Sequence, residues 1–295
     1  MFVLAHLSDL HLSAPPRLID LAGKRGLGFI NWHRGRKYIH RLEALEAVTR
    51  DLKGCTVDHI AVTGDLVNLS LADEYARARA WLEKLGPPTD VTVIPGNHDL
   101  YVPQAQHGPS DYWGAYMRGD DGAASGTFPF VRRRGAIALV ALSTALPTGP
   151  FLATGRLGQE QLARLATALE QTRALFRVVL IHHPPVSPPA RYLRRLTDAA
   201  EFRDLLAKHG ADLVLHGHDH CRSIVWLAGP DRAIPAVGVP SASARRAHGH
   251  ENAAGYNLFR IEGAAGGWRC EMIARERRAD GSVGEVERQT LAPPA

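Results

Sequence analysis

Short apolar runs, each about the length of a buried strand, recur along the first part of the chain. They are rich in Val, Ile and Leu and cover residues 2–7, 59–63, 91–94, 137–142, 178–181 and 213–215. Between them, apolar residues recur at helical spacing in 42–52, 75–85, 162–169 and 202–206. This alternation of strands and helices predicts an α/β fold with a largely parallel sheet, whose ligand site lies at the carboxyl ends of the strands.

The pattern changes after Gly217, where strand-like pieces follow one another without a convincing helix. They cover residues 223–227, 233–239, 256–261 and 268–274, and we expect them to form a second, mixed or antiparallel sheet. The charged stretch 275–295 predicts an edge strand followed by a loose tail. Because no segment repeats with a period of 20 to 50 residues, we interpret 1–295 as one domain.

Composition excludes several protein classes. With 295 residues, 45% hydrophobic and 22% charged, the chain is too apolar for a disordered protein and too long to need disulfide staples. The longest apolar stretch, 136–146, is far shorter than the roughly 20 residues of a membrane-spanning helix. The first residues show no basic leader, so we expect a cytoplasmic protein. The net charge of +5 suits an anionic substrate but is too small to predict a stable nucleic-acid complex.

Polar clusters stand directly after five of the predicted strands. They are Ser8-Asp9-Leu10-His11, Gly64-Asp65, Gly96-Asn97-His98-Asp99, His182-His183-Pro184-Pro185 and His216-Gly217-His218-Asp219-His220. Imidazole, carboxylate and amide oxygen donors suit Zn, Fe or Mn, and no cysteine lies in any cluster. Two divalent cations about 3.5–4 Å apart need an anionic ligand between them, and a strand-end carboxylate such as Asp65 can bridge them.

These clusters reproduce in order the signature D-x-H, G-D, G-N-H-D, H and G-H-x-H, so the chain resembles the calcineurin-like metallophosphoesterases. The His182-His183-Pro184-Pro185 motif looks most like the bacterial class III phosphodiesterases. The resemblance implies a four-layer αββα sandwich of two mixed β-sheets flanked by helices, with a binuclear metal site at the carboxyl ends of the strands. It also implies one ion held by Asp9, His11, Asp65 and His220, and a second held by Asp65, Asn97, His182 and His218.

The resemblance assigns the chemistry to His98, which would face the substrate and protonate the leaving oxygen or stabilise the transition state, with Asp99 fixing its orientation. A hydroxide bound to the metals would attack phosphorus. His183 and His216 adjoin the ligands and are candidates for supporting hydrogen bonds or substrate contact. His6, His40, His59 and His209 are interpreted as packing or surface histidines.

Two insertions follow the motifs. Residues 13–40 form an unusually long connection that mixes apolar residues with cations, including Arg25 and Trp32. This mix suits a lid over an anionic substrate or a peripheral contact with the inner face of the membrane, and a solvated loop is the alternative. Residues 101–127 contain aromatic side chains such as Tyr101 that could stack on a base or sugar.

The resulting hypothesis is a phosphodiesterase with two divalent metal ions that acts on a small cyclic nucleotide or glycerophosphodiester. The alternatives are a pyrophosphohydrolase of a lipid-linked nucleotide such as UDP-diacylglucosamine, and a phosphomonoesterase. The phosphomonoesterase ranks lower because no compact arginine pair adjoins a metal motif. A non-catalytic scaffold and a nuclease are remote. The sequence does not determine the oligomeric state.

Overall fold

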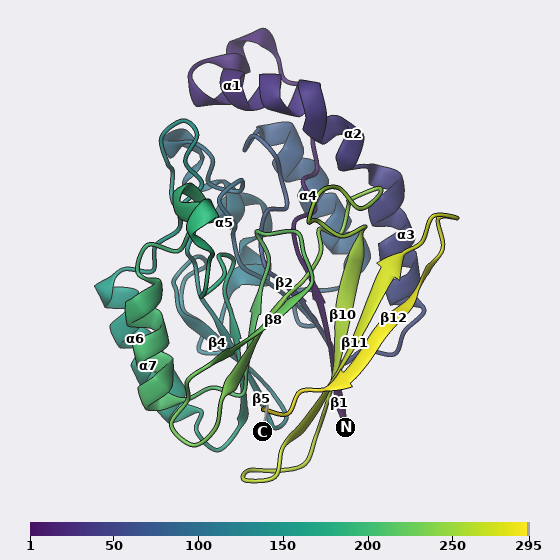
Figure 1. Ribbon diagram of the computed structural model, residues 1–295. Helices are drawn as coiled ribbons and strands as arrows, with labels where there is room; N and C mark the ends of the chain where they lie inside the picture. The colour runs from purple at the N-terminus through teal and green to yellow at the C-terminus, as the bar shows by residue number, and fades with distance from the viewer. Residues whose placement is uncertain (294–295) are drawn as a thin grey trace.

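The computed structural model describes residues 1–293 and contains two six-stranded mixed sheets (Figure 1). The first has the strand order β12-β11-β10-β1-β2-β3 and the second β4-β5-β6-β7-β9-β8. The strands of the first sheet are β1 (Phe2–Leu7), β2 (His59–Val62), β3 (Val91–Val93), β10 (Gly255–Glu262), β11 (Arg269–Arg277) and β12 (Val283–Thr290). Those of the second are β4 (Phe130–Arg134), β5 (Ile137–Ala141), β6 (Phe176–Leu180), β7 (Leu213–His216), β8 (Ser223–Leu227) and β9 (Ile234–Gly238).

The predicted strands of the first 215 residues form, but the expected pairing of the later ones is wrong. They do not build a sheet of their own: β8 and β9 extend the sheet of β4–β7, while β10, β11 and β12 continue the first sheet. β10 pairs antiparallel with β1, and Phe259 lies opposite Leu4. Hydropathy indicates that a strand is buried but not which neighbour it pairs with, because pairing depends on contacts distant in sequence.

The main core lies around the first sheet and between the two sheets, where Leu4 and Val62 belong to the same buried cluster as Leu139 and Leu215. Helices α3 (Leu42–Lys53) and α4 (Ala72–Leu85) contribute to this cluster. A second cluster buries α6 (Gln159–Gln171) and α7 (Ala199–His209) against the second sheet. This is the predicted four-layer αββα sandwich (Figure 1). No helix among the described residues combines the length and apolar character needed to cross a bilayer.

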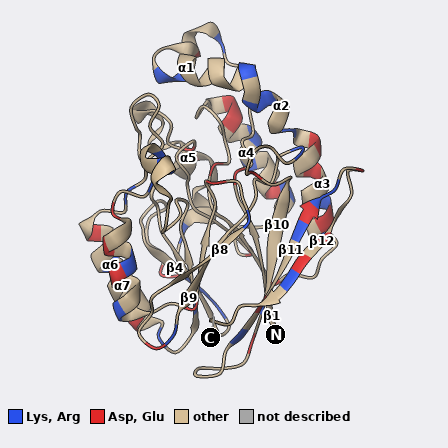
Figure 2. Ribbon diagram, viewed as in Figure 1, with Lys and Arg blue, Asp and Glu red and all other residues tan. Residues whose placement is uncertain are grey.

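Most of the insertion at 13–40 is helical, so the alternative of an irregular loop is wrong for residues 18–39. It contains η1 (Leu18–Leu21), α1 (Lys24–Asn31), the π-turn η2 (Trp32–Arg36) and α2 (Lys37–Ile39). We call residues 18–39 the cap, because they lie over the carboxyl ends of the strands (Figure 1). Lys and Arg dominate its charged side chains (Figure 2).

The second insertion also contains short helical segments, which are η3 (Pro103–Ala105), α5 (Gly108–Trp113) and η4 (Gly114–Met117). Buried Arg132 on β4 holds this region by donating hydrogen bonds to the carbonyl oxygens of Ala115 at 3.0 Å and Arg118 at 2.7 Å. One further helical segment, η5 (Pro189–Arg194), follows the loop after β6. β12 lies at an edge of the first sheet, and the end of the expected tail, 294–295, is outside the described residues.

Candidate metal centre

Both sheets deliver the motif side chains to one place. The loops after β1, β2 and β3 carry Asp9, Asp65 and Asn97, and those after β6 and β7 carry His182 and His218. All five of these residues are buried. The site therefore lies at the junction of the two sheets, at the carboxyl ends of their parallel strands, as the alternation of elements predicts.

Four of the predicted ligands form a first cluster. The Asp9 Oδ1 atom lies 3.2 Å from the Nε2 atom of His220 and 3.8 Å from the Nε2 atom of His11. The two Nε2 atoms are 3.0 Å apart, and the Oδ2 atom of Asp65 lies 4.0 Å from that of His11. Asp9, His11 and His220 thus bring their ligand atoms together, and Asp65 joins them through His11.

A second cluster shares Asp65 with the first. The Nε2 atom of His182 lies 3.5 Å from the Oδ1 atom of Asp65 and 3.3 Å from the Oδ1 atom of Asn97. Asp65, His182 and His218 also offer ligand atoms within 4.8 Å of one another. One oxygen of Asp65 therefore faces each cluster, which is the arrangement required of a carboxylate that bridges two cations.

Backbone strain is concentrated at these residues. Asp9, His11, Asp65, His218 and His220 all have positive φ, between 47° and 69°, which non-glycine residues rarely adopt. Only two other non-glycine residues in the described chain, Ser70 and Phe151, share this conformation. Such strain costs of order 1–3 kcal/mol per residue and is typical of functional sites.

Close packing of the loops requires glycine at Gly96 and Gly217. A Cβ atom on Gly96 would clash with the Oδ1 atom of Asp65, and one on Gly217 would clash with the Oδ2 atom of Asp9. The glycines of the motifs thus let neighbouring backbone approach the candidate ligands.

Hydrogen bonds fix the orientation of the candidate histidine ligands. His182 donates from Nδ1 to the carbonyl oxygen of Thr63 at 2.6 Å, so its Nε2 atom faces the site. His220 donates from Nδ1 to the carboxylate of Glu251 at 3.2 Å. His218 donates from Nε2 to the Arg194 carbonyl oxygen at 2.9 Å, which leaves the lone pair on Nδ1. Partners of this kind are typical of histidines that bind metals.

The electrostatics of the site fit divalent cations. Burial lowers the pKa of His182 and of His220, but the carboxylates of Asp65 and Asp9 respectively overcome this effect and raise each pKa to about 9. Protons on these imidazoles balance the buried carboxylates. Asp9 Oδ1 is buried without a hydrogen-bond partner. An orphaned oxygen beside converging imidazole nitrogens matches the donor set of Zn, Fe or Mn.

His98 lies beside both clusters, but its contacts differ from the expected ones. Its Nδ1 donates to the carbonyl oxygen of Asn68 at 2.6 Å, and its backbone N–H donates to Asp65 at 2.7 Å. The expected contact between Asp99 and the His98 ring does not form. The carboxylate of Asp99 instead accepts backbone N–H groups of Leu66, Val67 and Gly96, because it is buried beneath these loops.

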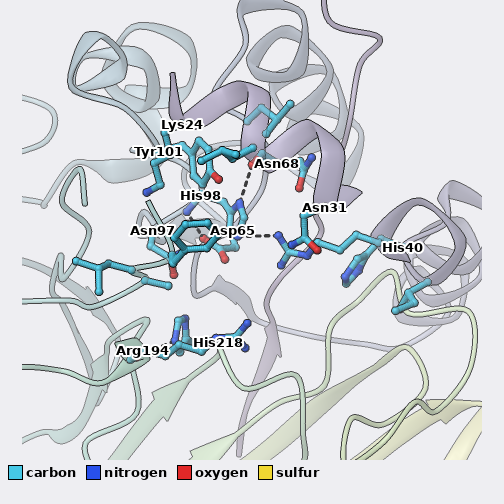
Figure 3. Close-up of a pocket in the computed structure, with 18 of the residues that line it drawn as sticks. Lys24, Asn31, His40, Asp65, Asn68, Asn97, His98, Tyr101, Arg194 and His218 are labelled. Atoms are coloured by element: carbon cyan, nitrogen blue, oxygen red, sulfur yellow. Dashed lines mark hydrogen bonds between the residues drawn. The ribbon is translucent and has the colours of Figure 1, made fainter. Parts of the chain in front are cut away.

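A cavity of about 800 Å³ opens over the clusters (Figure 3). Asp65, Asn97, His98, His218 and His220 form part of its wall, and Tyr101 lines it as predicted.

The other predicted substrate contacts do not line the cavity; they are Arg25, Trp32, His183 and His216. Arg25 donates to the carbonyl oxygens of Leu69 and Ser70, and Trp32 stacks on Phe29. His183 is held by Thr144 and Ala153, while buried His216 donates to the carbonyl oxygen of Gly217.

The structure adds residues that the motifs do not identify. Four basic residues line the cavity: Lys24, Arg34, Arg36 and Arg194. The sequence ranks the phosphomonoesterase lower because no compact arginine pair adjoins a metal motif, and this reason no longer holds. His40, interpreted from the sequence as a packing residue, offers a ligand atom within 4.8 Å of those of His11 and His220. The basic composition of 13–40 was a signal for the cap residues, whereas nothing in the local sequence marks His40 or Glu251.

Two curated proteins are similar in sequence to this chain. A protein from Rhodococcus erythropolis named a probable cyclic nucleotide phosphodiesterase is 25% identical over 230 residues, covering 77% of this chain and 67% of the relative. A second protein of that name, from a Synechococcus species, is 27% identical over 274 residues, covering 91% of each chain.

Solved structures share the fold. A dimetal phosphatase from Danio rerio has a TM-score of 0.61 at 12% identity, covering 99% of each chain. A purple acid phosphatase from yellow lupin has a TM-score of 0.56 at 12% identity, covering 98% of this chain and 53% of the plant protein. The model of the calcineurin-like phosphoesterase family matches residues 2–222, most of the chain. With the ordered motifs and the shared fold, this match shows that the chain belongs to the calcineurin-like phosphoesterase family.

Proposed function

We propose that this phosphoesterase uses two divalent metal ions to hydrolyse a phosphodiester bond of a small anionic molecule. The observation that carries the proposal is the position of Asp65, whose two carboxylate oxygens face different ligand clusters, 4.0 Å from His11 and 3.5 Å from His182. Asp9, His11 and His220 would complete one site with Asp65, and Asn97, His182 and His218 the other. When bound, such ions supply Lewis acidity to phosphoryl oxygens and lower the pKa of a water molecule.

The protein's own side chains would bind and orient the substrate. Lys24, Arg36 and Arg194 line the cavity and place positive charge around it. His98 stands on its wall beside Asp65 (Figure 3). Lys24 lies 4.2 Å from the ring centroid of Tyr101, and its ammonium donates to Thr148 at 2.9 Å. Burial lowers the pKa of Lys24 to about 8, so most of its charge is present at neutral pH. These cations would hold a phosphoester anion over the clusters.

Cavity size and relatives support a small substrate. A volume of about 800 Å³ falls within the roughly 300–1,000 Å³ range of small-molecule sites. Both curated relatives are named probable cyclic nucleotide phosphodiesterases. We therefore propose cyclic nucleotides and glycerophosphodiesters as the first substrates to assay.

The apolar part of the cavity favours a second candidate, a lipid-linked nucleotide diphosphate cleaved at its pyrophosphate. Leu27, Ile30 and Phe151 line the cavity and are 44%, 47% and 84% exposed, so an acyl chain could cover them. Activity on an amphiphilic substrate would then depend on micelles or liposomes. If anionic liposomes neither bind the protein nor change its turnover, this candidate is excluded.

The first experiment compares bis(p-nitrophenyl) phosphate with p-nitrophenyl phosphate, using chelator-stripped protein to which Mn, Zn or Fe is restored. We expect metal-dependent hydrolysis with preference for the diester. Preference for the monoester would identify a phosphatase and refute the proposal. Inactivity on both esters despite two bound ions would direct attention to the lipid-linked substrate. The Glu262→Gln variant, altered at an exposed site at the end of β10, is the matched control.

A further inference from the structure

Arg36 stands out among the basic residues of the cap because its guanidinium reaches the catalytic end of the cavity. It is the last residue of the π-helical segment η2, and its Nη1 atom donates to the Nε2 atom of His98 at 2.8 Å. Within the described residues it has no carboxylate partner at ion-pair distance and makes no other side-chain hydrogen bond. Arg36 lines the cavity, so its remaining donors are available to a ligand there.

The hydrogen-bond chemistry defines which group presents charge to the cavity. A guanidinium only donates, so the Nε2 atom of His98 must accept from Arg36. The Nδ1 atom of His98 then carries the ring proton and donates it to the carbonyl oxygen of Asn68 at 2.6 Å. The imidazole in this state is a neutral support, and the positive charge beside Asp65 belongs to Arg36.

Arg36 is not required to hold the cap in place. Arg25 already ties α1 to the carbonyl oxygens of Leu69 and Ser70, at 3.0 and 2.6 Å. Lys24 donates a hydrogen bond to Thr148, in the segment after β5. These contacts contrast with Arg36, whose one hydrogen bond is made to a side chain of the site itself. A structural anchor would direct its donors to backbone carbonyls, as Arg132 does.

We propose that Arg36 binds a non-bridging oxygen of the substrate phosphoryl group, and that His98 is a positioning residue that holds the guanidinium in place. The planar guanidinium matches phosphate geometry and offers two parallel donors, which an ammonium does not. This inference rests on the proposed function, since it places a phosphoester over the Asp65 clusters. It gives the cap a direct part in recognising the anion.

The test measures phosphate binding and catalysis separately. Manganese-loaded wild type, Arg36→Ala, Arg36→Gln and Arg36→Lys are titrated with inorganic phosphate by calorimetry and assayed on bis(p-nitrophenyl) phosphate. We expect every variant to bind two ions per chain. In the Ala and Gln variants, phosphate affinity should fall at least about tenfold, and kcat/KM should fall roughly 10²-fold. Lys should recover only part of the loss, and ethylguanidinium should rescue Arg36→Ala. Lys53→Ala, which removes an exposed cation at the end of α3, is the charge-matched control.

The positioning role of His98 has its own readout. His98→Gln keeps a side-chain acceptor for Arg36 and should retain more phosphate affinity than His98→Ala. The double variant Arg36→Ala/His98→Ala should bind phosphate no more weakly than Arg36→Ala alone, because His98 acts on phosphate through Arg36. Additive losses of affinity would refute this positioning role.

Two results would overturn the assignment of Arg36. One is wild-type phosphate affinity and kcat/KM in both Arg36→Ala and Arg36→Gln. The other is loss of metal from these variants, which would make Arg36 a support of the metal site. If wild type hydrolyses neither ester yet its phosphate binding depends on Arg36, the proposed diesterase function fails while the assignment stands.

Discussion

Replacing Glu251 with Gln should weaken one of the two proposed metal sites and leave the other unchanged. Glu251 accepts a hydrogen bond from the Nδ1 atom of His220 at 3.2 Å, so it supports the first cluster alone. In the second cluster, the same position on His182 is bonded to the backbone carbonyl of Thr63. The substitution therefore removes a charge that acts on one ligand and has no counterpart at the other site.

The magnitude follows from the geometry. Loss of a partner that orients a metal-bound histidine typically costs 10- to 100-fold in metal affinity, or about 1.4 to 2.8 kcal/mol. A ceiling comes from Coulomb's law, which gives about 5 kcal/mol for unit charges at this separation and an effective dielectric constant of 20. The Glu251 side chain is 23% exposed, so solvent screening reduces its contribution below that ceiling.

The pH dependence of this loss has a defined sign. Burial lowers the pKa of His220, but Asp9 and Glu251 raise it to about 9, so a proton competes with the metal at neutral pH. The Gln substitution also weakens the binding of that competing proton, which offsets part of the loss of metal affinity. Because the proton competes more strongly at pH 7 than at pH 8.5, the net loss of metal affinity should be smaller at pH 7.

The assay is a competition titration of chelator-stripped protein with Mn and Zn at both pH values, with Glu262→Gln as the control. Two unchanged dissociation constants in Glu251→Gln would refute the role of Glu251, and equal weakening of both sites would refute the assignment of His220 to one cluster.

Three further predictions concern other parts of the structure. Asp65→Ala should lose both metal ions and activity together by elemental analysis and esterase assay, and two ions retained per chain would remove Asp65 as the bridge. Burial lowers the pKa of His59 to about 3, so below pH 6.5 the unfolded chain binds a proton that the folded chain excludes until about pH 3. As the pH falls from 6.5 to 3, the free energy of unfolding should therefore decrease by up to about 1.4 kcal/mol per pH unit. Urea titrations at several pH values should show that this free energy depends less steeply on pH in His59→Gln than in wild type, and an equal pH dependence would contradict this. Arg132→Met should lower the free energy of unfolding by at least about 3 kcal/mol, because the carbonyls of Pro88 and Val91 also lose their donor; a change below 1 kcal/mol in urea would count against this.

The fold was predictable where burial alone defines an element. Residues 2–7 coincide with β1, and its side chains from Val3 onward are buried on both faces, as in a central strand. β4 escaped prediction because Arg132, Arg133 and Arg134 interrupt its hydropathy. Arg132 is buried only because backbone carbonyls from distant segments surround its guanidinium. That compensation depends on tertiary structure and leaves no local pattern.

The residues of the candidate site also fall into those that the sequence could predict and those that it could not. Asp9, Asp65 and His182 could be located because each follows a strand, and parallel strands bring such loops to one edge. Arg36 and Glu251 could not, since they reach the clusters from a cap and a loop whose paths depend on packing. Within the cap, four glycines between Gly23 and Gly35 are typical of an irregular loop, yet tertiary contacts hold most of this segment in helical form.

The pairing of β1 with β10 has a consequence for the order of events during synthesis. β1 is synthesised before both of its neighbours in the sheet, and one of them, β10, ends only at Glu262. The Oδ2 atom of Asp9 likewise accepts a hydrogen bond from the backbone N–H of His218, which is 209 residues distant. Contacts so remote in sequence form late and slowly. A nascent chain must therefore extend a further 209 residues beyond Asp9 before His218 can bond to it, so the candidate ligand clusters cannot assemble before that point of synthesis.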